Sequence, residues 1–100
     1  MEALPARFLD AEGRLKQFPS KRKDRLAALL LLAGRFEADR RYTESEVNDI
    51  LDAAHAFGDR CLLRRELYNH HLIDRERNGS AYWLPEAWPA WTREGEDTHA

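Results

Sequence analysis

The sequence predicts an α+β fold in which three helices are followed by a C-terminal β-hairpin. Apolar residues recur at helical spacing over residues 21–36, 43–57 and 59–70. Soon after the third of these segments comes Asn78-Gly79, the strongest short hairpin signal, because both residues tolerate the positive φ of a type I′ turn. Two helices joined by a short turn and followed by a hairpin predict a winged helix-turn-helix, here with a small N-terminal hairpin in addition.

The chain has room for one domain. Its 100 residues are close to the lower limit for a self-sufficient core. We expect this domain to span residues 1–85 and a partly disordered tail to occupy residues 86–100. Within the tail, Trp88 and Trp91 lie in a proline-punctuated stretch that can fold back over apolar surface, whereas the polar segment from Thr92 to Ala100 is expected to be disordered.

The N-terminal segment allows two interpretations. Phe8–Asp10 and Arg14–Lys16 can pair as a small hairpin with Gly13 in its turn, and an amphipathic helix over residues 7–18 is the alternative. Pro19-Ser20 then breaks the pattern, and Ser20 is a good N-cap for the first long helix.

The first helix is expected from Lys21 to Phe36, with a wide apolar stripe that suits a central position in the fold. Its first turn contains the basic cluster Lys21-Arg22-Lys23, at the positive end of the helix dipole. Charges of that sign are mildly unfavourable there. The cluster is therefore either a binding surface or a simply solvated first turn.

The second and third helices have clear starting signals. Thr43 and Glu46 form a capping box, and a short extended link near Arg41 precedes them. Gly58 is expected to end the second helix, and Asp59 to cap the third, which runs to about His70. In the third helix Leu63 and Leu67 point inward together. Arg65 then lies on the opposite, exposed side, close to Cys61, Tyr68 and Asn69, while Arg64 lies at the boundary.

A two-residue Asn78-Gly79 turn fixes the register of the C-terminal hairpin. It pairs Arg77 with Ser80, Arg75 with Tyr82 and Ile73 with Leu84. The Arg75 guanidinium is then expected beside the Tyr82 ring, where a cation–π contact contributes about 0.5–1 kcal/mol.

Enzymatic function is not expected. The sequence has no phosphate-cradling glycine loop, no His-Glu-x-x-His and no Cys-x-x-Cys, so we expect no catalytic residue, no cofactor and no metal. His70 and His71 are adjacent, which points their rings apart on a helix and suits chelation poorly. Cys61 is expected to be an ordinary free thiol. The longest apolar run, Leu26 to Ala33, is too short to span a membrane, and a single cysteine fits a cytoplasmic location.

The candidate site is basic, although the chain as a whole has a net charge of −2. Arginine suits forked contact with phosphate or guanine, and asparagine suits adenine. In a winged helix the third helix enters the major groove and the wing contacts the backbone or the minor groove. The sequence therefore predicts a transcriptional-regulator-like module that binds double-stranded DNA. The predicted nucleic-acid-binding residues are Lys21, Arg22, Lys23, Arg64, Arg65, Asn69, Arg75 and Arg77.

Two alternatives remain open at this point. The arginines can form a solvated face on which Glu66, Asp74 and Glu76 are their partners. The domain can also be a protein-interaction or oligomerisation module without DNA binding. In that case the third helix or the segment with Trp88 and Trp91 would dock a regulatory protein or a second copy of the chain. Exposed apolar groups on the third helix and paired charges would favour that alternative.

Several segments also resemble a bacterial family known as domain of unknown function 2087. Phe18–Leu26 resembles its opening motif and Arg41–Leu51 its second motif, and residues 63–67, 74–75 and 79–83 complete the pattern. Members occur alone or attached to helix-turn-helix regulators, which implies a transcription-linked role but transfers no catalytic residue. Members usually have a glycine near His71, where it closes the third helix in the left-handed conformation; this chain has Asn69-His70-His71 instead.

Overall fold

In the described part of the chain, three α-helices and a three-stranded antiparallel sheet make up an α+β fold, in agreement with the sequence prediction. The computed structural model describes residues 4–93. In chain order the elements are a short 3-10 helix (Ala6–Phe8), α1 (Arg22–Ala33), β1 (Arg41–Tyr42), α2 (Glu44–Ala54), α3 (Arg60–Asn69), β2 (Asp74–Arg75), β3 (Tyr82–Trp83) and a second 3-10 helix (Ala90–Arg93). No helix within residues 4–93 has the length and apolar character that crossing a membrane requires.

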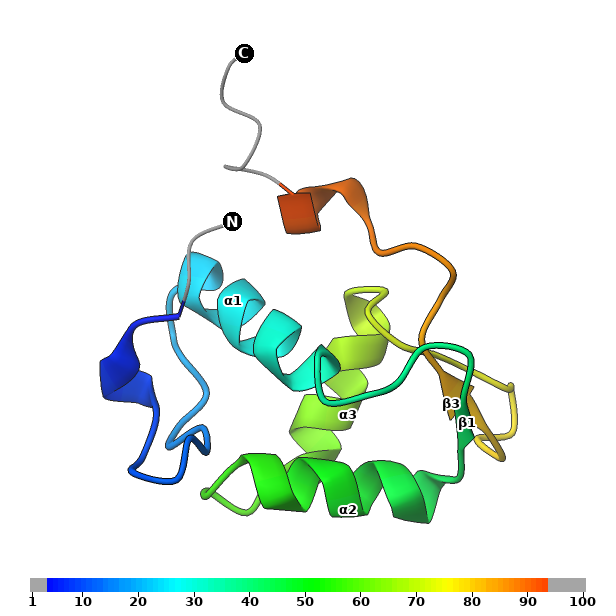
Figure 1. Ribbon diagram of the computed structural model, residues 1–100, viewed down its shortest axis with the longest axis horizontal. Helices are drawn as coiled ribbons and strands as arrows, with labels where there is room; N and C mark the ends of the chain where they lie inside the picture. The colour runs from blue at the N-terminus through cyan, green and yellow to red at the C-terminus, as the bar shows by residue number, and fades with distance from the viewer. Residues whose placement is uncertain (1–3, 94–100) are drawn as a thin grey trace.

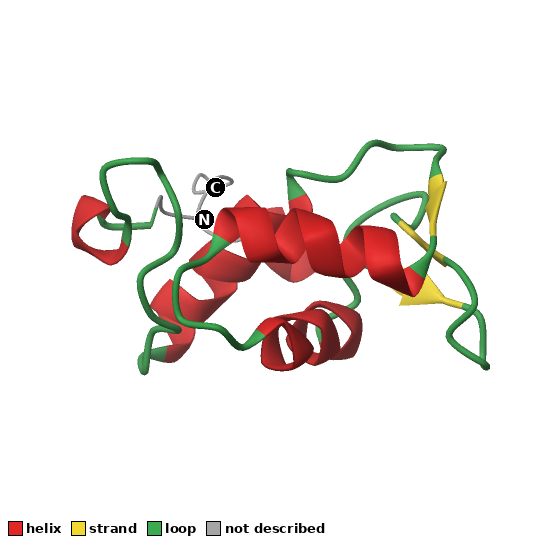
Figure 2. Cartoon of the chain, turned by 90° about the horizontal axis from the view of Figure 1, so that it is seen from below, coloured by secondary structure: helices red, strands yellow, loops and turns green. Residues whose placement is uncertain are grey.

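The helix α3 is central, because it packs against both α1 and α2 (Figure 1). Its Leu63 and Leu67 are fully buried, as the sequence predicts, and they meet Leu29 of α1 and Leu51 of α2 in one core. The sheet lies at the end of the molecule where α2 begins. Figures 1 and 2 agree that the N-terminal 3-10 helix lies at the opposite end.

The helix α1 is shorter than expected at both ends. It begins at Arg22, so Lys21 and not Ser20 occupies the N-cap position, and no side chain caps the helix. At the other end it stops at Ala33, and the Gly34 N–H donates to the Leu30 carbonyl at 3.0 Å. Phe36 is buried beyond the helix end and packs edge-on against Tyr42, with 5.2 Å between ring centroids.

The capping signals of α2 and α3 are confirmed. The Thr43 hydroxyl accepts from the Glu46 N–H at 3.1 Å, and the Glu46 carboxylate accepts from the Thr43 N–H at 2.8 Å. Asp59 caps α3 by accepting from the Leu62 N–H at 3.2 Å. However, α2 ends at Ala54, before Gly58, because His55 is already extended. Gly58 lies in the connecting turn with a φ of +69°.

The N-terminal hairpin is confirmed, and the alternative helix is reduced to the single turn Ala6–Phe8. Leu9 and Leu15 form an antiparallel bridge, and Leu15 also forms a parallel bridge with His55. The Leu15 N–H donates to the Ala54 carbonyl at 2.9 Å. This segment is therefore joined to the end of α2 and covers one end of the core.

The Arg75–Tyr82 pair of the C-terminal hairpin is confirmed, but the turn is not the expected one. Arg75 pairs with Tyr82 and Asp74 with Trp83, and β3 lies between β2 and β1. Asn78 does not have a positive φ, so the type I′ prediction is wrong. Instead the Gly79 N–H donates to the Glu76 carbonyl, and Gly79 alone takes the left-handed conformation in a longer loop. The ladder is too short to include either of the other two expected pairs, Arg77 with Ser80 and Ile73 with Leu84.

The segment after β3 folds back on the core. Trp88 and Trp91 pack against it, and the Trp88 indole N–H donates to the Leu72 carbonyl at 3.1 Å. Thr92 belongs to the second 3-10 helix and is buried, so the ordered chain continues further than the sequence predicts. The expected disorder otherwise falls on residues 94–100, which lie outside the described part of the chain.

Candidate nucleic-acid interface

A pocket between α3 and the C-terminal hairpin brings together half of the predicted site. It has a volume of about 420 Å³. We call it the arginine pocket; its lining residues are Glu44, Cys61, Arg64, Arg65, Tyr68, Asn69, Arg75 and Tyr82. Four of these, Arg64, Arg65, Asn69 and Arg75, were predicted from the sequence. They come from two elements that meet because the hairpin follows α3 directly.

Arg64 is half-buried and its side chain is held in place. Its guanidinium donates to the Asn48 side-chain oxygen of α2, and its second terminal nitrogen lies 3.9 Å from the Cys61 sulfur. Neither partner is charged. The guanidinium therefore retains its full positive charge while its orientation is fixed by neutral groups.

Arg75 occupies the hairpin wall of the pocket. Its guanidinium lies over the ring of Tyr68, 4.8 Å from the centroid, and donates to the carbonyls of Glu76 and Arg77 at 3.5 and 3.3 Å. The expected stack on Tyr82 is thus wrong. Tyr82 is directly opposite Arg75 in the ladder, but its side chain is buried, so the exposed Tyr68 ring is the face that the guanidinium reaches.

The pocket lining also includes four residues that were not among the predicted site residues: Glu44, Cys61, Tyr68 and Tyr82. The Tyr82 hydroxyl donates to the Glu44 carboxylate at 3.4 Å. Burial is the main reason that the pKa of Tyr82 is raised, and the positive charges of Arg64 and Arg75 oppose that rise. The hydroxyl therefore stays protonated and acts as a donor. Gly79 of the hairpin loop lies close to the Glu44 carboxylate, a contact between distant segments that no local sequence signal indicates.

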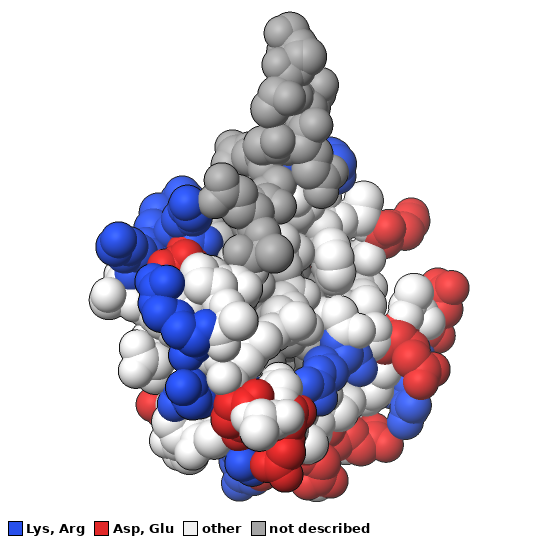
Figure 3. Space-filling view, turned by 60° about the vertical axis from the view of Figure 1, so that its left-hand side comes forward, with Lys and Arg blue, Asp and Glu red and all other residues white. Residues whose placement is uncertain are grey.

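The other predicted residues do not line this pocket. Arg77 is exposed in the hairpin loop, outside the pocket lining. Lys21, Arg22 and Lys23 are exposed at the start of α1, toward the end of the molecule opposite the sheet (Figure 1). Figure 3 shows basic side chains gathered along one edge of that side and separated by uncharged surface from a second basic group. The basic residues therefore form separate patches.

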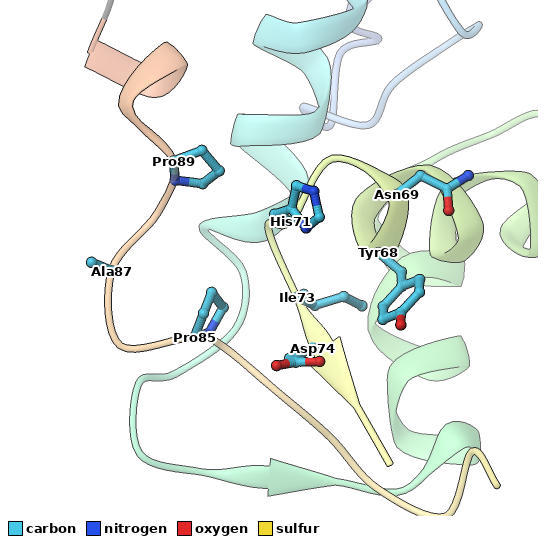
Figure 4. A pocket seen from close by; sticks show the side chains of 8 residues that line it. All are labelled: Tyr68, Asn69, His71, Ile73, Asp74, Pro85, Ala87 and Pro89. Carbon is cyan, nitrogen blue, oxygen red and sulfur yellow. The ribbon is translucent and has the colours of Figure 1, made fainter. Parts of the chain in front are cut away.

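A second pocket, of about 620 Å³, lies on the other side of Tyr68 and Asn69. Pro85 and Pro89 form one wall, and His71 and Ile73 from the chain between α3 and β2, with Asp74 at the start of β2, face them (Figure 4). Its lining contains one carboxylate and no arginine or lysine. This chemistry does not suit a polyanion, so the second pocket is not part of the candidate interface.

The described residues contain no cluster of side chains that could hold a metal ion. Residues 4–93 contain no group of three or more His, Cys, Asp or Glu side chains arranged to hold a metal ion. Cys61 is exposed and free, beside Arg64. His70 lies against the C-terminal segment, where its ring meets that of Trp91 edge-on with 6.2 Å between centroids.

Fold and pocket define a small α+β domain with a basic groove between α3 and its C-terminal hairpin. The model of the family DUF2087, described as an uncharacterized protein conserved in bacteria, matches residues 14–84. The chain belongs to this family, which confirms the resemblance seen in the sequence. The comparisons found no significant match among curated proteins or among solved structures.

Proposed function

We propose that this chain is a transcriptional-regulator-like nucleic-acid-binding module that uses α3 and the C-terminal hairpin. The topology supports a winged helix-turn-helix: β1 lies between α1 and α2, the hairpin follows α3, and the sheet order is β1-β3-β2. In that interpretation α3 is the recognition helix. The hairpin is the wing, with Arg77 near its tip.

The observation that carries the proposal concerns the ion pairs of the arginines on α3 and on the adjoining hairpin. None of Arg64, Arg65 and Arg75 forms an ion pair with a carboxylate in the described part of the chain, whereas Arg41 pairs with Glu76 at 2.7 Å and Arg60 with Asp52 at 2.8 Å. A solvated face with internal partners would pair the first three as well. Unpaired guanidinium groups that line one groove are suited to phosphate oxygens and guanine edges.

The proposed interface is smaller than the set predicted from the sequence. Arg65 and Asn69 are exposed on α3 and are assigned to base edges, and Arg77 is assigned to a phosphate. Lys21, Arg22 and Lys23 are left out, because they lie away from α3 and the hairpin. Because the net charge is −2, we expect modest affinity for non-specific DNA.

The alternative, a protein-interaction or oligomerisation module, requires exposed apolar groups on the same face. Leu62 and Trp83 are half-buried, and the Trp83 ring is covered by Arg41 at 4.3 Å. Tyr68 is 37% exposed, but Arg75 lies over its ring. The face of α3 that carries the arginine pocket therefore offers a docking protein little apolar area, which favours nucleic acid as the partner of this face.

Salt dependence of duplex binding tests the proposal. A mixed-sequence DNA duplex is titrated with the full chain by fluorescence anisotropy at about 50 and 200 mM salt. If several phosphates are contacted, the affinity falls by orders of magnitude over that range, because condensed counterions are released on binding. Absence of binding at the lower salt concentration would contradict the proposed function.

A further inference from the structure

We propose that the arginine pocket is a binding site for a single phosphate group, which Arg64 and Arg75 hold from opposite walls. The inference rests on the proposed function in one respect: the phosphate is taken to belong to the nucleic-acid backbone. It also changes one assignment: Arg64 was expected to face bases, and its place in the pocket makes it a phosphate ligand instead.

The pocket concentrates positive charge that is not neutralised internally. Three guanidinium groups line it against one carboxylate, that of Glu44. The Glu44 carboxylate is engaged by the Tyr82 hydroxyl, and no arginine nitrogen in the described chain lies within ion-pair distance of it. The local balance is therefore positive on a protein whose total charge is negative.

The two principal donors are held in place before any ligand arrives. Arg64 is anchored to Asn48, and Arg75 is anchored by the Tyr68 ring and by two backbone carbonyls. Fixing a long side chain in its bound geometry removes part of the entropy cost of binding. Both anchors are neutral, so they fix the position of the charge without cancelling it.

The geometry favours a phosphate over a base or a carboxylate. Arg75 already lies over the Tyr68 ring, so that face is not free to stack a base. A phosphate has oxygens in several directions and can accept from guanidinium groups on two walls at once, whereas a carboxylate has two coplanar oxygens. The Tyr82 hydroxyl already donates to Glu44, so the guanidinium groups are the donors assigned to the phosphate.

The pocket is also larger than one phosphate needs. Its volume of about 420 Å³ leaves room for the groups to which the phosphate is attached. The bound phosphate group could belong to a DNA backbone or to a free phosphorylated small molecule. These two sources are separated by the experiment.

The test is an NMR titration of the ¹⁵N-labelled full chain with inorganic phosphate, against sodium chloride of matched ionic strength. We expect saturable shifts at Tyr68, Asn69 and Tyr82. Arg64→Ala and Arg75→Ala each weaken phosphate binding roughly ten- to a hundredfold, the effect of losing a charge-assisted hydrogen bond. Arg35→Ala, an exposed arginine outside the pocket, leaves it unchanged. Shifts that do not saturate, or that are the same in Arg75→Ala as in Arg35→Ala, would overturn the inference.

Glu44→Gln gives a result that loss of folding cannot imitate. Removing the one carboxylate of the pocket should tighten phosphate binding by about fivefold, because an unfavourable charge a few ångströms away disappears. An unchanged or weaker affinity in this variant would contradict the assignment of the pocket.

A short DNA duplex added to the phosphate-bound chain identifies the source. Displacement of phosphate by the duplex supports a backbone phosphate in the pocket. Saturable phosphate binding without any duplex binding supports the pocket with a free phosphorylated ligand, and it rejects the proposed function. A third outcome is that the duplex binds in a salt-dependent way, that Arg64→Ala and Arg75→Ala do not weaken this binding, and that inorganic phosphate causes no shifts. This outcome would reject the phosphate site in the arginine pocket, whereas the proposed function would still hold.

Discussion

The guanidinium group of Arg75 lies over the ring of Tyr68, with the Cζ atom 4.8 Å from the ring centroid. This contact joins the C-terminal half of α3 to the first strand of the hairpin. It forms across the junction where the two elements build the arginine pocket, so it controls the position of one pocket wall relative to the other.

A double-mutant cycle measures this coupling. We expect Tyr68→Ala and Arg75→Ala to interact by about 0.5–1 kcal/mol in the free energy of unfolding, as a partly exposed cation–π contact does. The measurement is urea unfolding of the parent, the two single variants and the double variant. Purely additive effects would mean that the stacked geometry contributes nothing to stability.

His71 supplies a second stability prediction. It has a φ of +63° in the position after the α3 C-cap, its N–H donates to the Tyr68 carbonyl at 3.0 Å, and the Leu72 N–H donates to the Leu67 carbonyl at 2.9 Å. This is the Schellman arrangement, which glycine adopts without strain. His71→Gly should therefore stabilise the fold by about 1 kcal/mol.

The control is the neighbouring residue. His70 has a φ of −94°, which any residue adopts, so His70→Gly should lower the melting temperature while His71→Gly raises it. Equal effects of the two substitutions in thermal unfolding would show that the left-handed conformation of His71 costs nothing.

His55 connects the end of α2 to the start of α3. Its buried ring donates from Nδ1 to the Leu51 carbonyl at 2.6 Å and accepts at Nε2 from the Asp59 N–H at 2.9 Å. His55→Phe keeps an aromatic ring but leaves both backbone groups without a partner, and we expect a loss of about 1–3 kcal/mol. His55→Gln, whose amide can replace one of the bonds, should recover part of the loss in chemical unfolding. If Gln is no better than Phe, the hydrogen bonds are not the cause.

Asp10 makes stability depend on pH at the N-terminal hairpin. Its carboxylate accepts from the Arg14 and Glu12 N–H groups at 2.8 and 2.9 Å, and the Arg14 backbone hydrogen bond is the largest cause of a pKa lowered from the usual 3.8. Because the folded pKa is depressed, the stabilisation is present above that usual value and is lost as the pH falls through the folded pKa.

The measurement is thermal unfolding between about pH 2 and 7. Asp10→Asn should lower the melting temperature near neutral pH, and its difference from the parent should shrink as the pH falls. Asp49→Asn is the matched control, because Asp49 is an exposed acid on α2 without an ion pair in the described chain. A difference between Asp10→Asn and the parent that is the same at every pH would contradict the assignment.

Sequence patterns predict the parts of this fold that short-range interactions decide. The Thr43–Glu46 capping box, the inward pair Leu63 and Leu67, and the Arg75–Tyr82 register were all predicted, because each depends on spacing within one element or across one turn. The two basic elements of the arginine pocket could be placed together for the same reason.

What could not be predicted depends on contacts between distant segments. The end of α2 is set by Leu15, which bonds to its last turn from a position far earlier in the chain. Likewise, whether Arg75 meets Tyr82 or Tyr68 depends on which ring the core buries, and Glu44 enters the pocket through the packing of α2 on the hairpin. None of these leaves a signal in local periodicity.

The most direct test of the central claim is the DNA affinity of an Arg64→Ala, Arg65→Ala double variant. A Lys16→Ala, Arg35→Ala variant removes the same charge from exposed positions away from α3 and serves as the control. In fluorescence anisotropy at low salt, the account predicts a loss of affinity of at least tenfold in the α3 variant, with the control close to the parent. Equal affinities of the two variants for the duplex would contradict it.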